Sequence, residues 1–356
     1  MSKAAELAAL IGSQSAQSNR NLVINGAALV SQRGDSTGIH DTGYYAVDRF
    51  QIVYSGEDEL RNSITQASDG PDGFSNSLKI ETTTAESAVA SDERVYVITR
   101  LEGQDLQQLG YGTSAAKSIT VSFYVKSSVT GTYSFIIYQE DGNDTIGGTY
   151  TINSANTWER KTLTFAGNTA AAIADDNTAG LIFYWCLMAG SDYTSASNTS
   201  WGEWSTAKFF FGHAQNGVGT TTNATWQLTG VQIELGEQAT PFEHRSFADE
   251  LHRCQRYYAE RENATGGTIY YGNTLQAYGT SSIYGVIADY PVTMRATPTV
   301  SQSGTFGAYT ATSGDNSMNS TIGNLSATSH AWRTGGWSGT SNLTAGHASV
   351  LFANNG

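Results

Sequence analysis

Two stretches of sequence, NLVING at residues 21–26 and GVQIELG at residues 230–236, decide how the fold of this chain is interpreted. The second stretch continues as ATPFEHR at residues 239–245. They are typical of the strands that open and close one β-sandwich. The roughly two hundred residues between them are β-patterned and almost free of proline. The pair therefore predicts a sandwich over residues 21–245.

The strand pattern inside this region is most regular at residues 119–125, where Ile119, Val121, Phe123 and Val125 alternate with other side chains. Alternation changes phase at Gly230, where glycine permits a bulge or bend. Short strands joined by loops of this kind favour an all-β jelly-roll sandwich.

Composition sets limits on the partners. Only 14% of the 356 residues are charged, below the usual quarter, and the formal net charge is −13. A polyanion would be repelled, so nucleic acid is not expected as a partner. Acidity that serves solubility alone is the simpler interpretation of the same charge.

The longest apolar run, residues 181–188, fits a buried strand and falls short of the roughly 20 residues that a membrane helix needs. Membrane insertion is therefore not expected. Residues 1–12 lack the basic and apolar regions of a signal peptide, so we expect synthesis in a cytoplasm without ordinary export. Cys186 and Cys254 have no disulfide or metal-site spacing and are predicted to be buried thiols.

Residues 1–20 are predicted to form a short N-terminal helix and a linker. Leu7, Leu10 and Ile11 supply its apolar side chains. A helix of about ten residues is marginal alone in water, so it is expected to pack against a partner. That partner would be two further copies about a threefold axis or a larger assembly. A frayed terminus is the alternative.

Residues 246–258 are predicted to form a second helix that links two domains. Ser246 is a suitable N-cap, with Asp249 three residues later. The helix is expected to place one apolar face on the sandwich, made of Phe247, Leu251, Cys254 and Tyr258. Residues 259–356 are predicted to form a smaller, distal β-sandwich domain.

Several motifs resemble those of bacteriophage tail-fibre proteins. Residues 21–26 with YAVDRF at 45–50 are similar to their "NL-I-NG … Y-ADR-" opening. Residues 230–245 match their closing "G-VQ-E-G---TPFE-R", and residues 250–258 continue it through "E-L--CQRYY". YPVTMRATP at residues 290–298 looks like the "P--MRA-PT" segment of their distal domain.

The resemblance implies a virion protein with jelly-roll domains like those of carbohydrate-binding modules. Such a protein is usually a homotrimer, is attached to other virion proteins through its N-terminus, and recognises host cell-surface glycans. The alternative is a head fibre, capsid decoration or collar protein with a purely structural role. A polysaccharide depolymerase is a further alternative.

Two aromatic groups are candidates for glycan binding, because flat rings stack on sugar CH groups while amides and carboxylates bind hydroxyls. The first group is Tyr193, Trp201, Glu203 and Trp204 in an expected loop. The second is Trp332 and Trp337. Tryptophans that cap the end of the sandwich are the structural alternative for both.

The jelly-roll resemblance also implies a structural calcium ion held by the Glu234 carboxylate on the closing strand. No other cofactor is expected. The sequence contains no Gly-x-Ser-x-Gly, no His-Glu-x-x-His and no phosphate-binding glycine loop, so no catalytic residues are assigned and a non-enzymatic protein is predicted.

Overall fold

The computed structural model divides the chain into two compact units, Met1–Cys254 and Gln255–Gly356. It describes residues 19–56, 59–260, 268–277 and 283–299, and the strands at 305–310, 314–317, 325–327, 331–334 and 348–354. The predicted N-terminal helix, with Leu7, Leu10 and Ile11, lies outside the described residues. No helix in the part that is described is long and apolar enough to cross a membrane.

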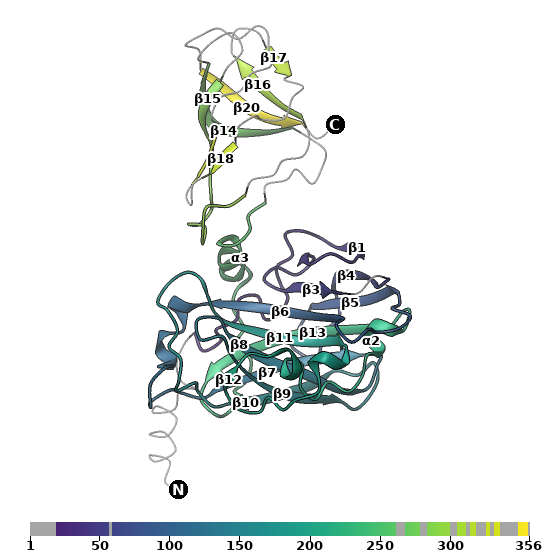
Figure 1. Ribbon diagram of the computed structural model, residues 1–356. Helices are drawn as coiled ribbons and strands as arrows, with labels where there is room; N and C mark the ends of the chain where they lie inside the picture. Colours follow the sequence, from purple (N-terminus) through teal and green to yellow (C-terminus); the bar gives the residue numbers. More distant parts are fainter. Residues whose placement is uncertain are drawn as a thin grey trace. The chain divides into compact units, whose positions relative to one another are not determined.

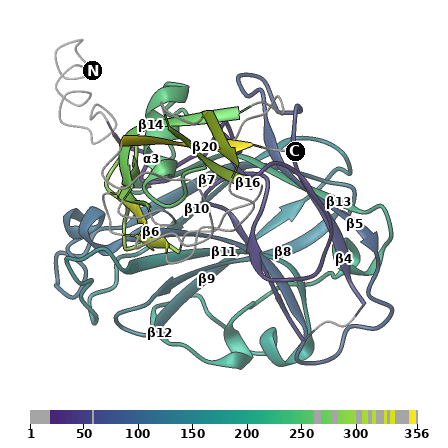
Figure 2. The ribbon, with the colours of Figure 1, turned by 90° about the horizontal axis from the view of Figure 1, so that it is seen from above.

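The first unit is a β-sandwich of two antiparallel sheets, which confirms the predicted fold class (Figure 1). One sheet has the order β1(Ser36–Ile39), β4(Arg61–Ala67), β5(Ser77–Thr84), β13(Thr225–Leu235), β7(Ile119–Ser127), β10(Glu159–Phe165). The other has the order β12(Gly202–Glu203), β9(Asp144–Ile152), β8(Gly131–Gln139), β11(Ala179–Ala189), β6(Arg94–Glu102), β3(Gln51–Ser55), β2(Gly43–Tyr44). Figure 2 shows the short β12 beside β9 at the edge of this second sheet.

The core lies between the two sheets and is built by alternation along the strands. Phe123 of β7, Phe135 of β8 and Trp185 of β11 are completely buried in it. Their rings pack edge to face or offset, with the Phe135 and Trp185 centroids 5.0 Å apart. The core therefore joins strands of both sheets.

The predicted change of phase in the closing strand is confirmed. The pairing of β13 with β7 shifts between Thr229 and Gln232, and Gly230 has a φ of +60°. A Cβ atom there would lie 2.8 Å from the Phe74 ring. Because of the bulge, Trp226 and Leu228 before it and Val231 and Ile233 after it are all buried in one core.

Residues 21–26, predicted as a strand, form an extended segment and a turn instead. The segment lies beside β13, where Leu22 N donates to Ile233 O and Val231 N donates to Gly26 O, both at 2.9 Å. Side chains replace the missing ladder: the Asn21 amide donates to Val231 O and accepts from Ile233 N. The two motifs therefore lie side by side, joined by hydrogen bonds of the Asn21 side chain instead of a full strand ladder. This arrangement is named here the side-chain lock.

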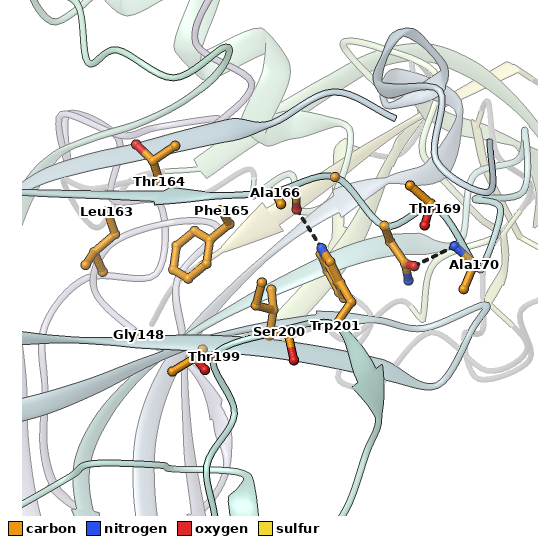
Figure 3. Close-up of a pocket in the computed structure, with 14 residues that line it drawn as sticks. Gly148, Leu163, Thr164, Phe165, Ala166, Thr169, Ala170, Thr199, Ser200 and Trp201 are labelled. Carbon is orange, nitrogen blue, oxygen red and sulfur yellow. Dashed lines mark hydrogen bonds between the residues drawn. The ribbon is translucent and has the colours of Figure 1, made fainter. Parts of the chain in front are cut away.

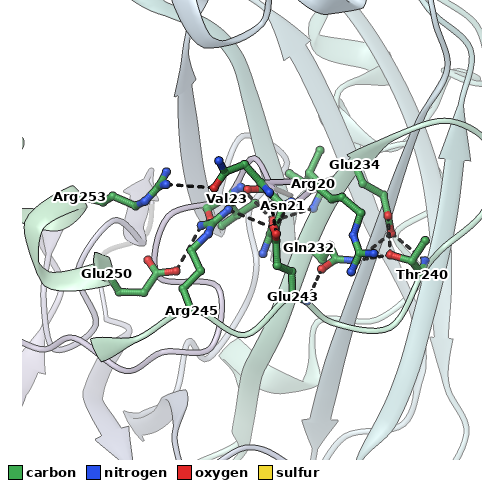
Figure 4. Close-up of polar contacts among 12 residues, drawn as sticks. Arg20, Asn21, Val23, Gln232, Glu234, Thr240, Glu243, Arg245, Glu250 and Arg253 are labelled. Carbon is green, nitrogen blue, oxygen red and sulfur yellow. Dashed lines mark hydrogen bonds and ion pairs between the residues drawn. The ribbon is translucent and has the colours of Figure 1, made fainter. Parts of the chain in front are cut away.

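The end of the closing motif completes this lock (Figure 4). The Glu243 carboxylate accepts hydrogen bonds from the backbone N–H groups of Asn19 and Asn21, at 2.7 and 2.8 Å. Arg245 donates to the backbone oxygens of Asn21 and Val23 and forms an ion pair with Glu243. The two terminal motifs of the sandwich are thus held together by charge-assisted hydrogen bonds.

The predicted second helix is α3(Phe247–Gln255), and its Ser246 cap is confirmed by a hydrogen bond from Asp249 N to Ser246 Oγ. Its buried side differs from the predicted one. Phe247 is 57% exposed, whereas Glu250 and Cys254 are buried. Glu250, which is not one of the predicted apolar residues, is paired with Arg245 at 3.2 Å and accepts a hydrogen bond from Asn25 N. A satisfied charge therefore lies on the buried side of the helix beside Cys254, which is buried as predicted.

The second unit is also β-structured. Its strands follow the order β17(Gly314–Ser317), β16(Thr305–Thr310), β20(Ala348–Asn354), β14(Thr268–Ala277), β15(Ile283–Asp289), β19(Ala331–Thr334), β18(Leu325–Ala327). All pairs between them are antiparallel.

Candidate functional site

The seven-stranded sheet of the first unit, in which β11 is the central strand, is apolar on both faces. Val97, Ile137 and Phe183 face the sandwich core, whereas their neighbours Tyr96, Ile136 and Tyr184 belong to a second apolar cluster on the outer face. Residues 190–216, named here the covering loop, bring Tyr193, Phe209 and Phe210 into this second cluster. This explains why β11 shows no alternation, because both of its faces are covered.

The covering loop leaves a pocket of about 380 Å³ at the outer face of the sheet, named here the Trp204 pocket. Its lining residues are Arg94, Tyr96, Tyr138, Asn143, Tyr184, Trp204 and Phe209. Trp204 is 38% exposed as a residue, and its ring meets Phe209 edge to face, with centroids 6.0 Å apart. Phe209 in turn meets Tyr184 at 5.0 Å. An exposed indole therefore stands on a buried aromatic base.

Polar groups at this pocket come from three strands or their ends. The Tyr138 hydroxyl donates to Asn143 Oδ1 at 3.1 Å. Burial raises the pKa of Tyr184, and burial with the nearby Glu140 carboxylate raises the pKa of Tyr138. Both phenols therefore stay protonated at neutral pH, as hydroxyl donors.

Arg94 is the charged side chain of the Trp204 pocket. Its guanidinium carbon lies 4.4 Å from the centre of the Tyr193 ring, a cation–π arrangement. Burial raises the pKa of Tyr96, and Arg94 opposes that rise through its charge and a hydrogen bond. Arg94 thus contacts the face of the Tyr193 ring and the hydroxyl of Tyr96.

A second pocket, of about 460 Å³, lies where the edges of the two sheets diverge and is named here the Trp201 pocket (Figure 3). Gly148 of β9, Phe165 of β10 and Trp201 of the covering loop contribute to its wall. The Trp201 indole donates to Ala166 O at 2.6 Å, and its ring packs on Tyr111 and the sandwich core. Trp201 thus closes the side of the sandwich.

The structure separates the four residues predicted in this loop. Trp204 lines one pocket and Trp201 the other. Tyr193 is only 6% exposed, because Arg94 and Phe210 pack on its ring, so it supports the first pocket from beneath. Glu203 is exposed on β12 and lines neither pocket.

The second predicted aromatic group is in the other unit. Trp332 lies on β19, where Ala288 and Ala327 are its register partners. Trp337 lies outside the described residues. The proposal of a glycan site there stays a prediction from sequence.

The carboxylate of Glu234 does not fit a calcium ion. It is buried, and its oxygens accept hydrogen bonds from Thr240 N at 2.8 Å, Thr240 Oγ1 at 2.6 Å and the Gln232 amide at 2.9 Å. A cation needs oxygen lone pairs where these donors stand. No group of three or more His, Cys, Asp or Glu side chains that could hold a metal ion occurs within the described ranges.

Most residues of the Trp204 pocket carry no recognisable signal in the sequence. Tyr96, Tyr138 and Tyr184 were hidden because a tyrosine in a strand normally indicates core or interface without saying which. A signal was available, since the unbroken apolar run of β11 requires cover on both faces. The cover itself comes from a loop, and no periodicity identifies it.

No protein-family model matches the chain, and no curated protein matches it. Among solved structures, the enzymatically active domain of tailspike protein 4 of bacteriophage CBA120 is similar at 12% identity with a TM-score of 0.35. That match covers 61% of this chain and 21% of the tailspike chain, so this chain spans about a fifth of that protein's length.

Two carbohydrate-binding structures are similar over their full or nearly full length. A family 11 carbohydrate-binding module from Clostridium thermocellum, in complex with a β-1,3-1,4-mixed-linked tetrasaccharide, is 12% identical with a TM-score of 0.29; the match covers 59% of this chain and 100% of the module. A xylan-binding domain from Paenibacillus barcinonensis is 11% identical with a TM-score of 0.27; the match covers 62% of this chain and 96% of the domain.

Proposed function

We propose that the protein binds a glycan in the Trp204 pocket. The observation that carries this proposal is Trp204, a 38% exposed residue whose ring is held on a buried aromatic base beside an amide and a guanidinium. Exposing a large apolar ring costs free energy in water, and a ligand that covers the ring regains it.

The chemistry of the pocket suits a sugar. The faces of a pyranose are made of CH groups that pack on an indole, while its hydroxyls need planar donors and acceptors. Asn143, the Tyr138 hydroxyl and Arg94 supply such groups at the rim. A volume of about 380 Å³ lies within the usual range for small-ligand sites.

A glycan array followed by titration calorimetry tests the proposal. We expect wild-type protein to bind at least one array glycan and Trp204→Ala to weaken that binding at least about 10-fold, since buried tryptophans dominate many binding interfaces. Phe247→Ala is the matched control, because Phe247 is the other large apolar side chain that is exposed in the described residues. An equal loss in both variants would contradict the proposal.

We propose a phage tail fibre or other virion appendage as the biological setting, with host-surface glycans as the ligand. The motifs at residues 21–26, 230–245 and 250–258, which resemble those of tail-fibre proteins, support this proposal. Purified protein should then adsorb to host cells and block infection. A purely structural virion component would do neither, and a protein absent from virions would contradict the setting.

The proposed assembly is a homotrimer attached through residues 1–20, and the proposed action is binding without hydrolysis. Light scattering should give three times the mass of one chain, and a monomer at micromolar concentration would contradict the trimer. Deleting residues 1–20 should abolish attachment to virions. Release of reducing ends from host exopolysaccharide would show a depolymerase instead.

A further inference from the structure

Two arginines lie on the outer face of the sheet that carries the Trp204 pocket, and neither forms an ion pair with an acidic side chain of the described residues. Arg94 and Arg100 are both on β6 and, with Tyr96 and Ile98 between them, face away from the sandwich core. Neither takes part in any ion pair formed between the described residues. Carboxylates outnumber Lys and Arg by 32 to 19 in this chain, so two arginines without an acid on one face are unusual.

Arg94 is the more confined of the two. It is half-buried, and its Nε atom is buried with no hydrogen-bond partner in the described part of the chain. The cation–π contact with Tyr193 uses the face of the guanidinium, and a hydrogen bond to Tyr96 uses one edge, which leaves its remaining in-plane N–H donors available. A cation taken out of water without a counter-ion is costly, and an anion that enters the pocket would remove that cost.

Arg100 extends the same face. Arg100, Ile182 and Tyr138 are register partners across β6, β11 and β8, so Arg100 lies about 10 Å across the sheet from Tyr138. Along β6 it is six residues from Arg94, about 20 Å. Its guanidinium already donates to the Tyr44 hydroxyl at 3.0 Å and to Gln51 Oε1 at 2.6 Å. It is therefore a weaker candidate for a direct contact.

The Glu140 carboxylate opposes the attraction that these cations exert on an anion. Glu140 is exposed in the turn after β8 and raises the pKa of both Tyr138 and Tyr184. An anionic ligand must therefore place its charge on the Arg94 side of the pocket, with the sugar ring toward Trp204. The arrangement of charges therefore predicts both the sign of the ligand's charge and the direction in which the ligand lies in the pocket.

We propose that the Trp204 pocket selects a glycan that carries an anionic substituent, a carboxylate or a phosphate, with Arg94 as its counter-ion. This inference rests on the proposed glycan binding. The ring stacks on Trp204, the anion accepts charge-assisted hydrogen bonds from Arg94, and Arg100 adds a longer-range attraction.

The first test uses wild-type protein alone. An array with matched uronic-acid, sugar-phosphate and neutral glycans should give binding among the acidic members, and the carboxylate and phosphate arms identify the substituent. Reducing the carboxyl groups of a bound uronic-acid oligosaccharide should weaken binding about 10- to 100-fold. Raising NaCl from 50 to 500 mM should weaken it further. Binding restricted to neutral glycans would overturn this inference and leave glycan binding intact, whereas no binding at all would overturn both.

The second test uses variants in calorimetry with the same oligosaccharide and its carboxyl-reduced form. Arg94→Gln should remove most of the difference in affinity between the two forms, Arg94→Lys should keep part of it, and Arg100→Gln should reduce it less. Lys79→Gln is the control, because it removes a cation that is paired with Glu81 on the other sheet. If Arg94→Gln leaves the difference unchanged while melting like wild type, Arg94 is not the counter-ion.

Discussion

Trp201 and Trp204 are three residues apart in one loop, yet they belong to two different pockets and differ in exposure and contacts. Trp201 donates its indole N–H to Ala166 O and packs on the core of the sandwich. Trp204 contacts Phe209 by one edge and keeps 38% of its surface exposed. Trp201 thus contributes to the packing of the sandwich, whereas Trp204 offers an exposed ring to a ligand.

The difference arises from what lies beneath each ring. Trp201 covers the seam where β9 and β10 separate, so its ring fills a gap between two sheets. Trp204 stands over a layer that Tyr96, Tyr184 and Phe209 have already filled. A ring on a completed layer adds little to the stability of the fold and is available to a ligand.

Removing Trp201 should have the largest effect on stability. Trp201→Ala would leave a cavity and an unpaired Ala166 oxygen, and we expect a loss of about 3 kcal/mol in the free energy of unfolding. Trp201→Phe should cost less, about 1 kcal/mol, because it loses mainly the hydrogen bond. Urea unfolding measures both, and an Ala variant as stable as wild type would remove the structural role of Trp201.

Acidification should loosen the loop that carries both tryptophans. Burial lowers the pKa of His213 from its ordinary value of 6.5 to about 4. Between these values the unfolded chain binds a proton that the folded chain does not, so stability falls as pH falls from 6.5 toward 4. From pH 7.5 to pH 5 the loss should be about 2 kcal/mol.

His213→Gln is the control for this pH dependence. His213 belongs to the covering loop, packs edge to face on Tyr133 and accepts a hydrogen bond from Ser134 N, so the variant removes the titrating ring that joins the loop to β8. Unfolding at several pH values should show a flatter profile in the variant. An unchanged profile would assign the acid sensitivity to other groups.

Removing Trp204 should have the smallest effect on stability. Trp204→Ala keeps the backbone hydrogen bond from Trp204 N to Asn143 O and removes a ring that is already partly in water. We expect a change of less than about 1 kcal/mol in the free energy of unfolding. A loss as large as that of Trp201→Ala would erase the contrast between the two tryptophans.

The sequence allowed much of the sandwich to be predicted. The alternation at residues 119–125 located β7, and the phase change at Gly230 located the bulge, because both depend on local backbone geometry. The two terminal motifs were predicted to open and close one sandwich, and both belong to the first unit. The first motif was wrongly predicted to be a strand. Hydrogen bonds of the Asn21 and Glu243 side chains hold it beside β13 in place of regular strand pairing.

The candidate site was only partly predictable. Trp204 was identified from its composition, but Arg94, Tyr138 and Tyr184 come from strands up to 110 residues earlier in the chain. Only the sheet register brings them together, and register depends on packing that no single stretch encodes. Tyr193 was predicted as a ligand-binding residue, but its ring is buried against Arg94 and does not line the pocket.

The central claim is that Trp204, and not Trp201, forms the ligand surface. Titration calorimetry of Trp204→Ala and Trp201→Phe with the strongest array glycan tests it most directly. The account predicts at least a 10-fold loss of affinity in Trp204→Ala and less than a twofold change in Trp201→Phe, on the order expected for a central aromatic contact and a distant one. Equal losses, or a larger loss in Trp201→Phe, would contradict it.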